Sequence, residues 1–154
     1  MSSNNGLIDP ADAAVLLVDH QSGLLQIVDH VNVRELRNNV AALAKAATLA
    51  GAPVIATASV PEGPNGPLIP EVFENAPKAT YVQRHGEINA WDVEGFRSAV
   101  EQTGRRTLLV AGIMTSICVV EPACRPSPRD TTCTPSSTPR APTPTRRSGS
   151  RSSA

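Results

Sequence analysis

The sequence predicts an α/β fold in three layers, α/β/α, with a mainly parallel sheet. Two short runs, residues 13–18 and 107–111, are apolar at almost every position, which is typical of parallel strands covered by helices on both faces. Between them, helix-like stretches alternate with further short strand-like runs. The order strand, helix, strand, loop, strand, helix, strand and helix start predicts right-handed crossovers between parallel strands.

The first strand, residues 13–18, leads directly into Asp19, His20 and Gln21. The carboxyl ends of parallel strands lie at the edge of the sheet where α/β proteins bind their ligands. Asp19 is therefore the first candidate site residue.

The clearest helix comes next. Asn32 is predicted to cap its amino terminus, with Glu35 three positions later, and Gly51 is predicted to end it. Its apolar residues recur at steps of three and four positions: Val33, Leu36, Val40, Leu43 and Ala47. This spacing predicts an amphipathic helix.

Two further strands are predicted in the middle of the chain. Residues 53–59 form the first, and the Pro and Gly content of residues 61–67 indicates a loop after it. Residues 80–84 form a short strand that ends in a basic residue, Arg84.

Asp92 is then predicted to cap a second helix, which Gly104 closes. The last clear strand starts at Thr107, and Gly112 follows in a turn that leads into a new helix. Cys118 stands near the amino terminus of that helix, where the helix dipole favours the thiolate form.

The composition changes abruptly after Ala123. From there to Ala154 the sequence has no Val, Ile, Leu, Met, Phe, Tyr or Trp, and Pro, Ser, Thr and Arg dominate. We therefore expect residues 1–123 to form the amino-terminal portion of one α/β domain, incomplete at its carboxyl end. Residues 124–154 are expected to be a disordered tail.

The tail also suggests a coding explanation. Reverse-translated with GC-rich codons from the third base of the Ala123 codon, it permits an apolar strand and turn. Our hypothesis is that residues 124–154 are out of frame, through a true frameshift or a sequencing error. Resequencing the coding DNA tests this, because a clean frame that matches the present translation removes the sequencing error.

Charge and hydropathy exclude several classes of protein. Residues 1–123 carry eight Lys or Arg against thirteen Asp or Glu, so this part has no overall attraction for nucleic acid. No signal-peptide pattern opens the chain, and no apolar run approaches the roughly 20 residues that span a bilayer. We expect a cytoplasmic protein without a nucleic-acid or membrane partner. Only Cys118 falls within this part, which argues against a disulfide framework.

Asp19, Arg84 and Cys118 each stand at or just beyond the end of a predicted strand, so a parallel sheet brings them to one edge. A carboxylate, a fixed cation and a thiol form a plausible nucleophilic site, in which the guanidinium favours thiolate and the carboxylate moves a proton. Each also has a plainer interpretation: Asp19 as a turn cap, Arg84 in a surface ion pair, and Cys118 as a small core residue.

Four motifs together resemble the isochorismatase-like cysteine hydrolases, and within them the YcaC-type branch. They are VDHQ at 18–21, GPNGPL at 63–68, RHGEINAWD at 84–92 and AGIMTSICV at 111–119. The resemblance covers roughly residues 9–123. It implies the three-layer fold and hydrolysis of a small amide-like substrate.

The resemblance also implies roles for the candidate residues. Cys118 matches the nucleophile that attacks a carbonyl carbon to give an acyl-enzyme, and Asp19 matches the acid/base. Arg84 stands where most amidase members have lysine. Because arginine stays protonated, it can only orient groups or stabilise charge, and proton transfer then rests on Asp19.

Other residues of these motifs are expected to contact the substrate: Gln21, Asn89, Trp91 and Met114. Trp91 has the alternative of anchoring the core. The family's cis peptide would fall at Ile113–Met114 and aim backbone N–H groups at an oxyanion.

Cofactor use is not expected. Nicotinamidases of the same superfamily bind a metal through mid-chain Asp and His, but residues 59–68 contain no His. His20, His30 and His85 do not form a ligand spacing, so we expect neither metal nor cofactor. The resemblance implies a homo-oligomer.

Two functions follow from these residues. The first is a cysteine hydrolase that cleaves a C–N bond through a Cys118 acyl-enzyme. The second is a non-catalytic, truncated remnant or binding module with the same fold. The superfamily spans several substrate classes, so the motifs do not specify the substrate.

Overall fold

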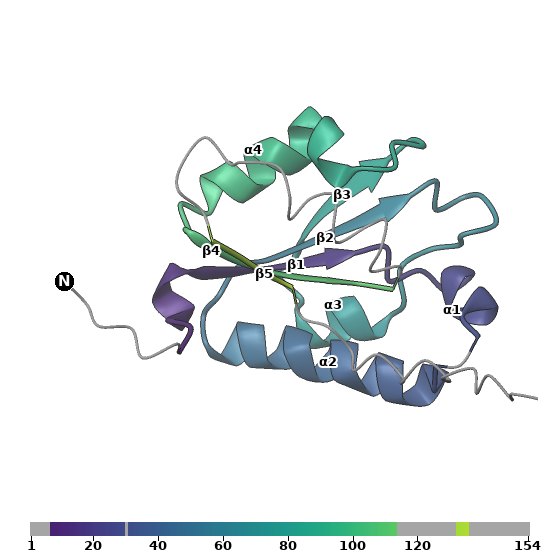
Figure 1. Cartoon of the computed structure of the whole chain (residues 1–154), viewed down its shortest axis with the longest axis horizontal. Coiled ribbons are helices and arrows are strands. Elements are labelled where there is room, and N and C mark those ends of the chain that lie inside the picture. The colour runs from purple at the N-terminus through teal and green to yellow at the C-terminus, as the bar shows by residue number, and fades with distance from the viewer. Residues whose placement is uncertain (1–6, 30, 114–131, 136–154) are drawn as a thin grey trace, which may run out of the picture.

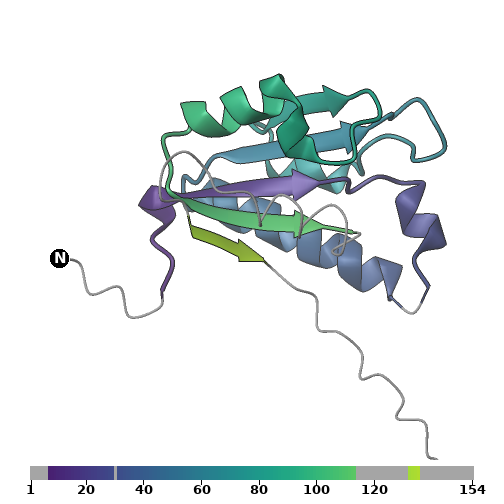
Figure 2. The same cartoon turned by 45° about the horizontal axis from the view of Figure 1, so that its top comes forward.

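A computed structural model of the chain describes residues 7–29, 31–113 and 132–135. Five parallel strands lie side by side in the order β3-β2-β1-β4-β5 (Figure 2). Their bounds are β1 Ala13–Val18, β2 Val54–Ser59, β3 Thr80–Arg84, β4 Thr107–Gly112 and β5 Thr132–Pro135. The predicted parallel sheet is confirmed.

Helices cover both faces of this sheet (Figure 1). On one face lie α2 (Val33–Leu49) and α3 (Glu71–Asn75), and on the other lies α4 (Glu94–Gln102). The remaining short elements are η1 (Pro10–Asp12), α1 (Leu24–Ile27) and η2 (Ala90–Asp92). The three-layer α/β/α architecture predicted from the sequence is therefore confirmed.

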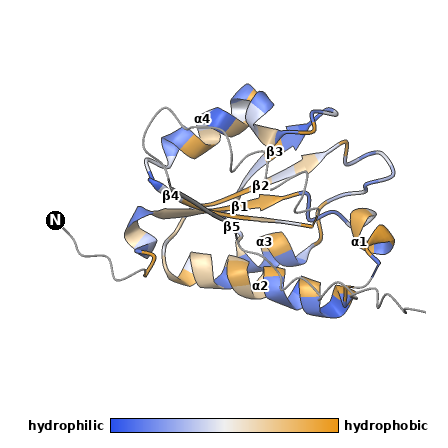
Figure 3. Ribbon diagram, in the orientation of Figure 1, coloured by the Kyte–Doolittle hydropathy of each residue, from blue (hydrophilic) through white to orange (hydrophobic). Residues whose placement is uncertain are grey.

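Strand β1 explains why both faces need a cover, because all six of its side chains are buried. Val15 and Leu17 pack into the cluster under α2, while Leu16 and Val18 pack into the cluster under α4. The strand is hydrophobic along its whole length (Figure 3). Alternation in a strand directs successive side chains to opposite layers, so an unbroken apolar run suits a central position.

The long helix begins where its cap predicts. The side-chain oxygen of Asn32 accepts a hydrogen bond from the backbone N–H of Glu35 at 3.2 Å. Val40, Ala44 and Ala47 form the buried stripe of α2. The positive φ of Gly51, 70°, turns the chain from the end of α2 toward β2.

One predicted cap is wrong. Helix α4 has Val93 at its amino-terminal cap position, without a side-chain cap, and Asp92 belongs to the preceding turn η2. The side chain of Asn89 caps that turn instead, since it accepts from the N–H of Trp91 at 3.0 Å. The short turn η2 therefore precedes α4. Aspartate favours cap positions, but Asp92 lies within η2 and not at the cap position of α4.

Strand β5 lies in the segment that the sequence predicts to be disordered. Thr132–Pro135 pairs with β4, in a register from Thr107↔Thr132 to Val110↔Pro135. Pairing satisfies backbone groups of β4 that an edge would expose, and threonine is β-branched and favours extended backbone. The disorder of the rest of the tail, the boundary at residue 123 and the reading frame of the tail stay predictions.

Candidate active site

An ion pair between Asp19 and Arg84 lies at the carboxyl edge of the sheet, where the sequence predicts a site. Asp19 follows β1 directly and Arg84 ends β3, so the guanidinium reaches across the intervening strand β2. Arg84 Nη2 donates to Asp19 Oδ1. The side chains are 0% and 5% exposed respectively, so the surface ion pair considered for Arg84 is not what the structure forms.

The guanidinium of Arg84 is held at all three nitrogens. Its Nε donates to Thr57 Oγ1 at 3.2 Å, and its Nη1 donates to the carbonyl oxygens of Glu87 at 2.7 Å and Ile88 at 2.8 Å. Burial of a cation is costly unless its donors are satisfied, and these partners offset that cost. Arg84 is thus a fixed support for Asp19.

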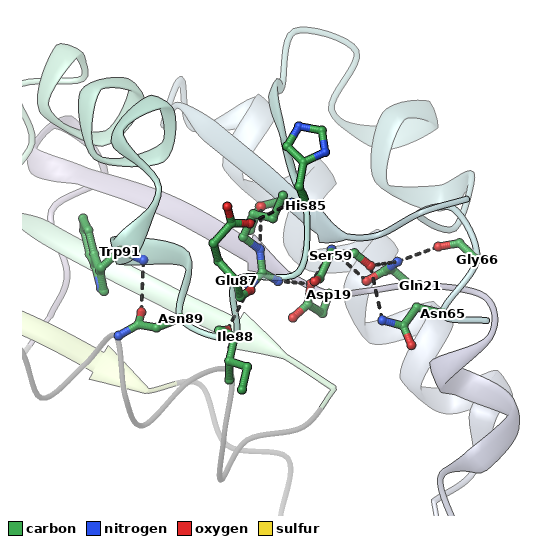
Figure 4. Close-up of polar contacts among 12 residues, drawn as sticks. Asp19, Gln21, Ser59, Asn65, Gly66, His85, Glu87, Ile88, Asn89 and Trp91 are labelled. Atoms are coloured by element: carbon green, nitrogen blue, oxygen red, sulfur yellow. Dashed lines mark hydrogen bonds and ion pairs between the residues drawn. The ribbon is translucent and has the colours of Figure 1, made fainter. Parts of the chain in front are cut away.

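The turn after β3 is shaped to present those carbonyls. Glu87 Oε2 accepts from the N–H of His85 at 2.7 Å, which closes the turn. Hydrogen bonds from its own N–H and from His85 lower the pKa of Glu87. Figure 4 shows Glu87 and Ile88 beside Asp19.

Gln21 joins the same edge to the loop after β2. Its side chain is completely buried; Nε2 donates to the carbonyls of Ser59 at 3.1 Å and Gly66 at 2.5 Å, and Oε1 accepts from Ser59 N–H at 3.1 Å. Ser59 N–H also donates to Asp19 Oδ1 at 3.2 Å, and Asn65 Nδ2 donates to Ser59 O at 3.2 Å. Figure 4 shows this chain of contacts. Sequence reasoning missed Ser59, although it ends a predicted strand.

The backbone is strained at two adjacent points of the site. Asp19 has φ 56° and Val60 has φ 46°, both in the left-handed region. Aspartate tolerates this region, whereas a β-branched valine there is a genuine outlier. Strain of this kind persists where the surrounding structure imposes it, and it concentrates at functional sites.

His20, the residue that follows Asp19 in the chain, is buried. It is 2% exposed, and its Nδ1 has no hydrogen-bond partner among the described residues. Burial lowers the pKa of His20 to about 4, and the negative charge of Asp19 only partly opposes that shift. The imidazole is therefore neutral at pH 7, so it adds no positive charge beside Asp19.

Asn89 and Trp91 lie to one side of Asp19, and Gln21 lies to the other (Figure 4). The ring of Trp91 meets that of Phe96 edge to face, with 5.3 Å between centroids, and packs against the cluster under α4. This contact matches the core-anchor alternative for Trp91. Asn89 is 4% exposed and caps η2.

Cys118, Met114 and therefore the Ile113–Met114 peptide lie outside the described residues. The register Val18↔Gly112 leads the chain out of β4 beside Asp19, at the same edge of the sheet. In the described ranges no group of three or more His, Cys, Asp or Glu could hold a metal ion. No helix within them is long and apolar enough to cross a membrane.

The described residues can bind and release a proton at one oriented carboxylate. Asp19 Oδ1 is occupied by Arg84 and Ser59, whereas Oδ2 takes no hydrogen bond from any described residue. A buried carboxylate with one committed oxygen and one open oxygen suits general acid/base work. Nothing in this set is itself a strong nucleophile.

Comparison with known proteins identifies a family model that matches most of this chain. The isochorismatase domain model matches residues 13–134. YcaC of Escherichia coli strain K12, named a probable hydrolase, is 48% identical over 116 residues. That match covers 75% of this chain and 56% of YcaC, so the chain spans just over half the length of this curated relative.

Two crystal structures of YcaC proteins share the fold. YcaC from Escherichia coli, described as an octameric hydrolase of unknown specificity, has a TM-score of 0.72 and 49% identity, over 75% of this chain and 57% of that one. YcaC from Pseudomonas aeruginosa, with hexane-2,5-diol and covalent acrylamide, has a TM-score of 0.73 and 47% identity, over 80% and 60%.

Proposed function

Because this chain belongs to the isochorismatase family, we propose that it is a cysteine hydrolase that cleaves a C–N bond of a small amide-like substrate. The observation that carries the proposal is the buried ion pair of Asp19 and Arg84 at the carboxyl edge of the sheet. It fixes one carboxylate beside the point where β4 ends at Gly112, six residues before Cys118.

In the proposed reaction Cys118 is the nucleophile and Asp19 the proton carrier. Asp19 Oδ2 takes the thiol proton, and the thiolate sulfur bonds to the carbonyl carbon. The C–N bond then breaks, and the leaving amine takes the proton from Asp19. Water attacks the acyl-enzyme, gives one proton back through Asp19 to the sulfur, and releases the acid.

Arg84 and Gln21 are positioning residues in this scheme. Every nitrogen of Arg84 is bound to the protein, and the Gln21 amide is occupied by Ser59 and Gly66. Both N–H groups of Gln21 Nε2 are occupied, and four of the five N–H donors of Arg84 are, which leaves one on Nη2. Asn89, Trp91 and Met114 keep the role of substrate contacts in the proposal.

The relatives support a reactive nucleophile. Pseudomonas aeruginosa YcaC carries covalent acrylamide, and acrylamide is an electrophile that adds readily to thiolates. Escherichia coli YcaC is a hydrolase of unknown specificity, so the amide-like substrate in the proposal rests on the resemblance of the sequence motifs to the cysteine hydrolases.

Alkylation of Cys118 tests the proposal. The full chain is treated with iodoacetamide from pH 5 to 9, and modified peptides are quantified by mass spectrometry. We expect Cys118 to react well below pH 8, because an activated thiol is a thiolate there, whereas a free thiol has a pKa of about 8.5. Asp19→Asn is expected to slow Cys118 at neutral pH.

The chain carries its own controls, since Cys124 and Cys133 follow Cys118 in the same molecule. They should react with the pH dependence of ordinary thiols. If Cys118 follows the same curve as these two cysteines, the hydrolase proposal fails and the non-catalytic alternative is supported.

We also propose that the chain forms a homo-oligomer, supported by the octamer of Escherichia coli YcaC. Size-exclusion chromatography with light scattering should give a mass that is a multiple of 16.1 kDa. A species of 16.1 kDa that persists at high protein concentration would contradict it.

A further inference from the structure

A second hollow lies at the opposite edge of the sheet from Asp19. It has a volume of about 570 Å³, within the range of roughly 300–1,000 Å³ that is typical of small-molecule sites. It opens where α2 meets β2, where α3 meets β3 and where α4 meets β4. The lining residues are Thr48, Gly51, Ala52, Pro53, Val54, Ala76, Pro77, Lys78, Ala79, Thr103 and Arg105.

The hollow is separate from the proposed active site. Val54 begins β2 and lines the hollow, whereas Ser59, which binds Asp19, ends the same strand. At about 3.3 Å per residue, the two ends lie roughly 16 Å apart. A ligand in the hollow would therefore not contact Asp19 or Arg84.

The charged lining residues are both cations, Lys78 and Arg105. Neither has an ion-pair partner within the described ranges, and Arg105 Nε is buried without an acceptor there. The adjacent Arg106, by contrast, is paired with Asp12 at 3.1 Å. A buried unsatisfied donor is costly, and an incoming anion would supply the missing acceptor.

The carboxyl-terminal ends of two helices also lie at this edge of the sheet, near Lys78 and Arg105. The carbonyl ends of α2 and α4 lie beside the hollow, and their negative dipoles favour cations. Several of their last carbonyls are already bonded within the chain, including those of Ala47, Thr48 and Val100. These helix ends still carry partial negative charge, so the charges of Lys78 and Arg105 have to outweigh it when an anion binds.

We propose that this hollow binds a small organic anion, with a carboxylate or phosphate head against Lys78 and Arg105 and a short apolar body. The body would lie against the apolar part of the lining: Ala52, Pro53, Val54, Ala76, Pro77 and Ala79. A planar guanidinium can bind two oxygens of such a head at once, and the lysine adds a point charge. This site is independent of the proposed hydrolase function.

Calorimetric titration of the full chain tests the site with three probes. Hexanoate carries the carboxylate head, hexyl phosphate carries the phosphate head, and hexanamide is the uncharged analogue of hexanoate. We expect binding of at least one anion and at least about tenfold weaker binding of hexanamide, because the amide lacks the charge that the cations recognise. The stronger of the two anions identifies the head group.

Variants locate the binding. Arg105→Gln and Lys78→Gln should each weaken the anion about tenfold, while Arg34→Gln, an exposed arginine on α2 outside the lining, should leave affinity unchanged. Circular dichroism confirms that each variant is folded.

Three outcomes overturn the proposal: no heat from either anion at millimolar concentration, equal binding of hexanamide, or unchanged affinity in Arg105→Gln. A lower melting temperature of Arg105→Gln with unchanged affinity would show that the residue only complements the end of α4. None of these results bears on the alkylation of Cys118, so the two proposals fail separately.

Discussion

Replacing Arg84 with methionine is expected to lower the free energy of unfolding by about 4 kcal/mol. Arg84→Met preserves much of the side-chain volume but removes the partner of Asp19, which is 3% exposed. It also leaves Thr57 and two carbonyls without their donor. An uncompensated buried carboxylate accounts for most of the loss. Urea unfolding followed by circular dichroism measures it.

A second variant separates charge from packing. In the double variant Asp19→Asn, Arg84→Met the buried charge is gone, so part of the lost stability should return. Arg34→Met, at an exposed position on α2, is the matched control and should stay within about 0.5 kcal/mol of the original chain. A loss below about 1 kcal/mol in Arg84→Met would show that the ion pair does not support the fold.

Lowering the pH from 6.5 to 4 is expected to destabilise the fold by about 3 kcal/mol through His20 alone. In the folded chain burial lowers the pKa of His20 to about 4 from its ordinary 6.5. Between these values the unfolded chain binds more protons, so stability falls as pH falls. Above pH 6.5 the contribution is fully present, and below pH 4 no more is lost.

The window from pH 6.5 to about 5 isolates this histidine, because carboxyls such as Glu71 and Glu87, whose pKa values are lowered, contribute only below about 4.5. His20→Leu should flatten the slope of unfolding free energy against pH in that window. The exposed His85 is the control, and His85→Leu should retain the slope. A flat slope in the original chain would mean that His20 is protonated without cost.

The sequence predicted the strands well. The run at 13–18 matches β1 residue for residue, because a fully buried parallel strand is apolar throughout, and the run at 80–84 matches the edge strand β3, of which only Arg84 is buried. Short helices are harder to recognise from the sequence. Helix α3 has five residues and buries only Val72, so it is too short to show a helical period. The Asp92 cap failed because a 3-10 turn precedes α4, and aspartate favours either position.

The site was predicted as far as topology allows. Parallel strands end at one edge, so Asp19 and Arg84 could be placed together before any contact was known. The different roles of Asp19 and Arg84 could not be predicted in this way. The number of N–H donors that Arg84 has left depends on Thr57 and on the carbonyl oxygens of Glu87 and Ile88, three and four residues further along the chain. No pattern in the sequence marks those contacts.

The sequence by itself determined the layered α/β architecture and the sheet edge at which Asp19 and Arg84 lie, because these follow from apolar periodicity and strand order, while the resemblance of its motifs indicated the family. Only the tertiary structure decided that Arg84 is a support for Asp19, that Gln21 connects this edge to the loop after β2, and that Lys78 and Arg105 line one hollow. The physical reason is that burial, charge compensation and hydrogen-bond satisfaction are properties of residues brought together from distant positions in the chain.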